Sequence, residues 1–242
     1  LHRSQPALLQ PGTESHGVQD PIHIQSTPHR PTIVDEHSLL QLNFSPDSPP
    51  DQIGPDYLPV LDSPSADLRA PVVFVGYGIA DSEGGFDDYA GLDVRDKVVL
   101  FLRGKPERYS KQVSHADKVH AAHAHGALAY LTATGPILNA YEARRGVTGR
   151  PSAFYGLTDP QRTIPGAWIS TTRAIAILQA APSANGDRLR TLQHNLNEGH
   201  TPQSAATDTI VTMRWHSAAQ DGTLHNVVFT LPGGGGSMTE EA

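Results

Sequence analysis

The sequence predicts an α+β fold, and two observations carry that prediction. First, Ala70–Ile79 (APVVFVGYGI) and Lys97–Arg103 (KVVLFLR) are short, strongly apolar and rich in β-branched residues, as buried strands are. Second, a segment with helical periodicity separates Lys97–Arg103 from the apolar Ala127–Thr132. A strand, a helix and a strand with short connections form a βαβ unit. We therefore expect the two flanking strands to be parallel, with a right-handed crossover.

The composition is typical of a loop-rich, strand-containing globular protein. The 242 residues are 38% hydrophobic and 18% charged, with 22 Gly and 20 Pro. The formal net charge is -7 at pH 7, and the basic residues are scattered, which argues against binding to nucleic acid or to an anionic membrane surface. The chain contains no cysteine, so disulfides and thiolate metal sites are excluded. Its longest apolar runs are far too short to span a bilayer.

The predicted helix has start and stop signals. Ser114 and Asp117 form a capping-box pattern, and Gly126 stands where a left-handed C-terminal cap belongs. The residues expected on the inner face of this helix are Ala116, Val119, Ala122 and His123.

The remaining segments are shorter. We expect strands at Ile22–Gln25, Leu39–Phe44, Ala167–Ser170, Thr209–Trp215 and Leu224–Leu231, and helices at Thr171–Ala181 and Asp187–Leu196. The last two strands are expected to be joined by a turn at Gln220–Gly222. The segments expected to be irregular are 1–20, 45–56, the acidic turn 81–93, 135–165 and the glycine-rich tail 233–242.

Three segments occur in a distinctive order. APVVFVGYGI precedes DDYAGLDVRDKVVLFLRGKP, and a helix that contains a lysine and ends in HGALAYL follows. This order resembles the protease-associated domain, in the version found in di-zinc aminopeptidases related to the transferrin receptor and glutamate carboxypeptidase. The resemblance covers residues 9–242, and Val72–Pro106 is its specific part. It implies a swivelling β/β/α domain: a curved β-sandwich or open barrel with flanking helices and one βαβ unit.

The resemblance also implies how the chain is divided. Residues 1–20 are expected to be an irregular arm, 21–232 the protease-associated domain, and 233–242 a flexible linker towards a catalytic domain that this chain lacks. An inserted domain must begin and end close together in space. Ile22–Gln25 and Val227–Leu231 are therefore expected to lie side by side, in one sheet.

By the same resemblance, the chain is expected to be a non-catalytic domain of a secreted or periplasmic bacterial zinc aminopeptidase. It would modulate substrate access or protein contacts. Its partners would be the catalytic metallopeptidase domain of the same parent protein and a peptide substrate, with neither nucleic acid nor membrane. No cofactor is expected in this chain, and zinc is expected only in the missing catalytic domain. Two alternatives stay open: an intact zinc metallo-aminopeptidase that hydrolyses N-terminal residues of peptides, and a free-standing peptide- or glycan-binding module. A deep apolar pocket with convergent polar groups would favour the last.

Three patterns imitate metal sites. His115 and Asp117 form a His-x-Asp triplet, but Asp117 stands where it caps a helix, which favours a capping residue beside an exposed histidine. His120 and His123 lack a third ligand. The acidic turn does not have the ligand spacing of the twelve-residue EF-hand loop. We therefore predict neither a metal site nor a catalytic residue in this chain.

The 135–165 loop is a candidate interaction surface. It contains aromatic and arginine side chains, the types that anchor protein interfaces. The candidate residues are Tyr141, Arg144, Arg145, Arg150, Phe154 and Tyr155. In related peptidases the protease-associated domain roofs the active-site cleft, so the loop is predicted to contact substrate there. An ordinary surface loop is the alternative.

Overall fold

The structure, a computed structural model, describes residues 7–8, 23–29, 32–34, 37–43, 50–179, 188–200, 203–219 and 222–228. The chain divides into two units: residues 32–218 form one, and residues 1–31 with 219–242 form the other. Each unit is described by itself. None of the helices in the described ranges has the length and apolar character needed to cross a membrane.

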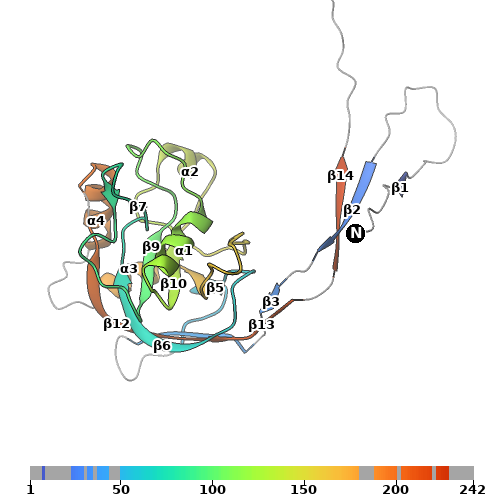
Figure 1. Ribbon diagram of the computed structural model, residues 1–242, viewed down its shortest axis with the longest axis horizontal. Coiled ribbons are helices and arrows are strands. Elements are labelled where there is room, and N and C mark those ends of the chain that lie inside the picture. The colour runs from blue at the N-terminus through green and yellow to red at the C-terminus, as the bar shows by residue number, and fades with distance from the viewer. Residues whose placement is uncertain are drawn as a thin grey trace, which may run out of the picture. The chain divides into compact units, whose positions relative to one another are not determined.

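A curved seven-stranded sheet forms the centre of the larger unit (Figure 1). Its strands, in spatial order, are β4 (Leu39–Asn43), β12 (Ala205–Trp215), β6 (Ala66–Phe74), β9 (Val98–Leu102), β10 (Ala129–Ala133), β11 (Gly166–Ile169) and β5 (Tyr57–Pro59). Strands β6, β9, β10 and β11 are parallel to one another, whereas β12, β4 and β5 pair antiparallel with their neighbours.

Among the described residues, four helices flank this sheet: α1 (His115–Ala124), α2 (Ala140–Arg144), α3 (Thr171–Gln179) and α4 (Arg188–Asn197). Two small two-stranded sheets complete the unit, β3 (Thr32–Val34) with β13 (Ser217–Ala219) and β7 (Ala80–Asp81) with β8 (Phe86–Asp87). The predicted α+β class, with a curved sheet and flanking helices, is confirmed.

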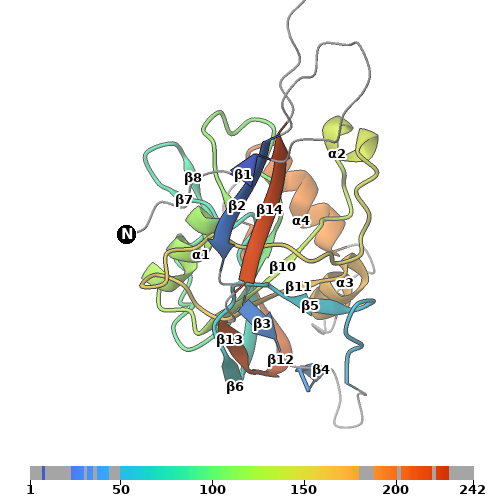
Figure 2. The same cartoon turned by 90° about the vertical axis from the view of Figure 1, so that its right-hand side faces the viewer.

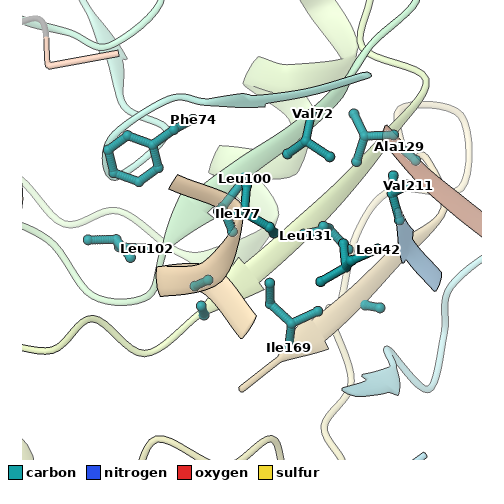
Figure 3. Close-up of a cluster of buried hydrophobic side chains, with 14 of the residues drawn as sticks. Leu42, Val72, Phe74, Leu100, Leu102, Ala129, Leu131, Ile169, Ile177 and Val211 are labelled. Carbon is teal, nitrogen blue, oxygen red and sulfur yellow. The ribbon is translucent and has the colours of Figure 1, made fainter. Parts of the chain in front are cut away.

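The central strands are covered on both faces, as their continuous apolar sequence predicts. Every residue of β9 and β10 is buried. Successive side chains point to opposite faces, so Leu100 and Leu131 join one core cluster while Phe101 and Tyr130 join another. Figure 3 shows the first cluster, in which side chains from β6, β9, β10, β11 and α3 meet. Strands β9 and β10 are parallel and α1 connects them, which confirms the βαβ unit.

Helix α1 begins as predicted but buries a different face. The Ser114 hydroxyl accepts a bond from the Asp117 amide, and the Asp117 carboxylate accepts one from the Ser114 amide, which together form the capping box. Gly126 has a φ of +84°, in the left-handed region. The buried residues are Lys118, Val119 and Ala122, whereas His123 is exposed. The expectation that His123 packs inward was therefore wrong, because Lys118, and not His123, lies on the buried face of the helix.

The entry and exit segments of the chain pair as the insertion argument requires. In the smaller unit, β2 (His23–His29) lies between β1 (Ala7–Leu8) and β14 (Gly222–Val228), and both pairings are antiparallel (Figure 2). Ile24 is the register partner of Val227, and His23 is the partner of Val228. The predicted side-by-side placement is confirmed for the described residues of both segments.

Several expectations need correction. Strand β12 pairs with β4 and β6, and β14 pairs with β2, so the last two long strands do not form a hairpin. The strand expected at Ala70–Ile79 begins at Ala66 and ends at Phe74, where the chain turns. The 135–165 loop contains α2, and the arm 1–20 contains β1. The tail 233–242 lies outside the described residues.

Candidate functional site

A groove opens at the edge of the sheet where the parallel strands β9 and β10 end. Their carboxyl ends are Leu102 and Ala133, and in α/β sheets ligands bind beside such strand ends. The groove has a volume of about 320 Å³, and a second hollow of about 550 Å³ adjoins it. The residues that line both are Arg103, Lys105, Glu107, Asn139 and Glu142. These five side chains are all polar or charged, unlike those of the deep apolar pocket that would favour a free-standing binding module.

Arg103 stands at the meeting point of these hollows. The central carbon of its guanidinium lies 3.9 Å from the Trp168 ring centre and 5.7 Å from the Phe154 ring centre. Burial lowers the pKa of Arg103, and the charge of Glu142 acts in the opposite direction. Within the described residues, its guanidinium has no hydrogen-bond or ion-pair partner. A guanidinium carries five N–H donors, so this side chain can bind an acceptor that the described residues do not supply.

The turn after β6 positions one wall of the groove. The Oδ2 atom of Asp88 accepts bonds of 3.0 Å from the backbone amides of both Tyr77 and Ile79. Gly76 and Gly78 have φ values of +55° and +71°, and a Cβ atom on Gly76 would lie 2.7 Å from Asp88. Burial raises the pKa of Asp88 to about 6. The GYG and DDY motifs of the sequence therefore form one structural unit.

Gln193 on α4 forms hydrogen bonds to two other segments at the groove, the turn after β6 and the 135–165 loop. Its Nε2 atom donates to the Tyr77 hydroxyl at 3.1 Å and to the Ile137 carbonyl at 2.9 Å, while its Oε1 accepts from the Ile137 amide. The side chain is buried and its amide is satisfied on both sides. Sequence reasoning placed only leucines on this helix face and missed Gln193, although it lies four residues after Leu189, on the same face.

Lys118 lies beneath the groove and is 3% exposed. Its Nζ donates to the carbonyls of Leu102 at 2.8 Å and Gly104 at 2.5 Å, just past the end of β9. The Tyr77 and Phe101 ring centres lie 5.5 and 5.6 Å from this ammonium. Burial lowers the pKa of Lys118 to about 7, while the charge of Asp88 acts in the opposite direction. The sequence marked this lysine only through the family resemblance.

His115 is enclosed by aromatic rings, so the expectation of an exposed histidine was wrong. Its Nε2 atom lies 3.1 Å from the Tyr130 hydroxyl oxygen, and its ring contacts Phe101, Tyr130 and Phe154. Burial, followed by the charges of Lys118 and Arg103, lowers the pKa of His115 to about 3. Across the described ranges, no group of three or more His, Asp or Glu side chains is arranged to hold a metal ion.

The six candidate residues of the 135–165 loop have different surroundings. Arg144, Arg145 and Arg150 are exposed, and Arg145 lines the second hollow. Phe154 is half-buried and packs edge-on against His115 and Trp168, with ring centres 4.9 and 5.6 Å apart. The remaining two are Tyr155, which is 37% exposed, and Tyr141, whose side chain lies outside what the structure describes.

The fold is that of a mixed α+β domain with one large curved sheet, and its strands β2 and β14 are paired. The structure is similar to an aminopeptidase from Aneurinibacillus sp. strain AM-1, with a TM-score of 0.50 and 18% identity over 86% of this chain. It also matches a zinc aminopeptidase from Bacillus subtilis, with a TM-score of 0.46 and 14% identity over 85% of this chain. The match covers 37% of the first enzyme and 36% of the second, and at these identities the likeness is one of fold. No family model and no curated protein matches the sequence.

Proposed function

We propose that this chain is a non-catalytic protease-associated domain of a secreted zinc-dependent aminopeptidase, where it modulates substrate access or protein contacts. The observation that carries the proposal is the pairing of β2 with β14. Chain entry and exit through one antiparallel pair is the arrangement of a domain inserted into another. The fold likeness to about a third of an aminopeptidase supports the same relationship.

The composition of the groove supports the proposed role. Four of its lining residues, Ile137, Leu138, Asn139 and Glu142, belong to the 135–165 loop, which is predicted to be an interaction surface. Lys105 and Glu107, from the segment after β9, line the groove as well. The charged and polar side chains that line the groove suit the backbone and termini of a peptide better than an apolar ligand.

The first experiment tests whether the chain is catalytic. The 242-residue protein would be incubated with zinc and leucine p-nitroanilide, and release of nitroaniline would be followed. We expect no hydrolysis above that of the buffer. Hydrolysis that a chelator abolishes would overturn the non-catalytic assignment and favour an intact aminopeptidase.

The second experiment tests control of access in the complete product of the gene. Residues 32–218 would be replaced by a short Gly-Ser linker, with β2 and β14 retained. We expect kcat/KM for leucine p-nitroanilide to be nearly unchanged and kcat/KM for an oligopeptide to change by about tenfold. A gene product without aminopeptidase activity, or the same change for both substrates, would refute the proposed role.

A further inference from the structure

A small cavity behind the groove is lined by three basic side chains. Its volume is about 130 Å³, enough for several water molecules. The lining residues are Phe101, Arg103, Gly104, Val113, His115 and Lys118, with no carboxylate among them. We call this space the basic cavity.

Lys118 contributes to this cavity a buried amino group without an ion-pair partner in the described part of the chain. Its two hydrogen-bond acceptors are neutral backbone carbonyls, and in the described residues no carboxylate lies within ion-pair distance of Nζ. An ammonium has three N–H donors, so one is left over. A buried charge is costly unless it is paired. Protonated Lys118 therefore has no ion-pair partner among the described residues, and the charges of Asp88 and Glu142 act on it only from beyond ion-pair distance.

Arg103 contributes the second cation, held in place by stacking on Trp168. It lines the basic cavity, the groove and the second hollow, so the three spaces meet at this side chain. Its planar guanidinium matches the two oxygens of a carboxylate or a phosphate. The charges of Lys118 and Arg103 also help to depress the pKa of His115, as expected where like charges gather without an anion.

We propose that the basic cavity is an oxyanion-binding site in which Arg103 and Lys118 hold a carboxylate or phosphate group. The ligand group supplies the negative charge that Lys118 lacks and the acceptors that Arg103 lacks. Two ligands carry such an oxyanion: a peptide that lies in the groove, through its carboxylate, and free inorganic phosphate. The inference does not depend on the proposed aminopeptidase parent.

The carboxylate of Glu142 allows the effect of charge on anion binding to be tested. It lies on α2, lines the groove, and its Oε2 accepts a 3.0 Å bond from the Asn139 amide. Its charge acts on both Arg103 and Lys118. Because this negative charge acts on the two side chains that would hold the anion, neutralising Glu142 should strengthen binding.

Arg108 offers a matched control. It lines the same groove, but its guanidinium already donates to the Glu198 carbonyl at 3.1 Å and lies 3.6 Å from the Glu198 carboxylate. If groove charge in general attracted anions, removing Arg108 and removing Arg103 would have similar effects. If the basic cavity is the site, of these two changes only the removal of Arg103 should weaken anion binding.

The experiment uses the full 242-residue chain labelled with ¹⁵N, titrated at constant ionic strength. The probes are N-acetylglycine, its uncharged analogue N-acetylglycinamide, and inorganic phosphate. The chain has two tryptophans, and the indole N–H signal of Trp168, beneath Arg103, reports binding. We expect saturable shifts with N-acetylglycine or phosphate and none with the amide. Binding of phosphate alone would identify the free ion as the ligand, and binding of N-acetylglycine would identify a peptide carboxylate.

The variants decide whether the site is the proposed one. Arg103→Gln should weaken binding by tenfold or more, on the order expected for a lost charged hydrogen bond. Arg108→Gln should leave the dissociation constant unchanged, and Glu142→Gln should lower it. Urea unfolding of each variant shows that it is folded. Equal losses in Arg103→Gln and Arg108→Gln, or no saturable shift with either oxyanion, would overturn the proposal.

Discussion

The carboxylate of Asp88 accepts a 3.0 Å hydrogen bond from the backbone amide of Tyr77, so one acidic side chain holds a turn formed eleven positions earlier. The same oxygen accepts from the Ile79 amide, and the backbone carbonyl of Asp88 accepts a hydrogen bond from the Ser204 hydroxyl. Tyr77 in turn reaches Gln193 and Asn197 on α4. Asp88 thus links the turn after β6 to the helix that borders the groove.

Replacing Asp88 with Ala should destabilise the protein by about 2–4 kcal/mol, because two buried amides lose their acceptor. Urea unfolding would measure this change. Asp67→Ala is the control, since its side chain is 79% exposed and pairs only with exposed Arg214. It should change the unfolding free energy by less than about 0.5 kcal/mol. Equal effects in the two variants would contradict the role of Asp88.

Protonation of His115 should destabilise the fold at acidic pH. Its pKa falls from 6.5 to about 3 in the folded protein, so between these values the unfolded chain binds the proton more readily. Stability is fully present above pH 6.5 and is lost as the pH falls towards 3, by roughly 1 kcal/mol per pH unit. Asp88, whose pKa is raised to about 6, acts in the opposite direction over part of this window.

His115→Gln removes the first effect and leaves the second. Its unfolding free energy should therefore fall less than that of the wild-type protein when the pH is lowered from about 7 to about 4. His123→Gln, on the exposed side of α1, should follow the wild-type profile. An NMR titration of the His115 ring that gives an ordinary pKa would contradict the prediction.

Gly166 leaves room for the Tyr130 ring on the neighbouring strand. A Cβ atom at this position would overlap the ring, so Gly166→Ala should cost about 3 kcal/mol. In a Tyr130→Leu background the same change should cost at least about 1 kcal/mol less, because the clashing atoms are gone. Thermal or urea unfolding of the four proteins of this cycle gives the coupling. Additive effects would show that the ring is not the cause.

The β2–β14 pairing can be tested by cross-linking, since the chain has no cysteine of its own. Gln25 and Asn226 are register partners, so Gln25→Cys with Asn226→Cys should form a disulfide under mild oxidation. Gln25→Cys with Gly222→Cys, where Gly222 pairs with His29, should stay reduced. Non-reducing electrophoresis distinguishes the two. Equal cross-linking would show that this register is not populated.

Sequence reasoning succeeded where the signal is local. The continuous apolar run of β9 predicted a strand covered on both faces, and Ser114 with Asp117 predicted the start of α1. The pairing of β2 with β14 was also predicted, from the spatial constraint on an inserted domain and not from either short segment alone.

The groove could not be predicted in this way, because its components come from distant segments. A lysine in an amphipathic helix indicates a solvent-facing side, yet Lys118 is buried, where its Nζ donates hydrogen bonds to the carbonyls of Leu102 and Gly104 at the end of β9. Phe154 was predicted to belong to an interaction surface, and the structure shows that it also packs on Trp168, a contact that only the folded sheet creates. Arg103 follows an apolar strand and carries no sequence signal of its stacking.

The geometry of the β2–β14 ladder has a mechanical consequence. His23 and Val228 are register partners, so tension applied between these two residues reaches the ladder at one end. Antiparallel rungs loaded from one end are expected to break in succession instead of all together. The ladder would then open from this rung towards the last one, Gly222 with His29.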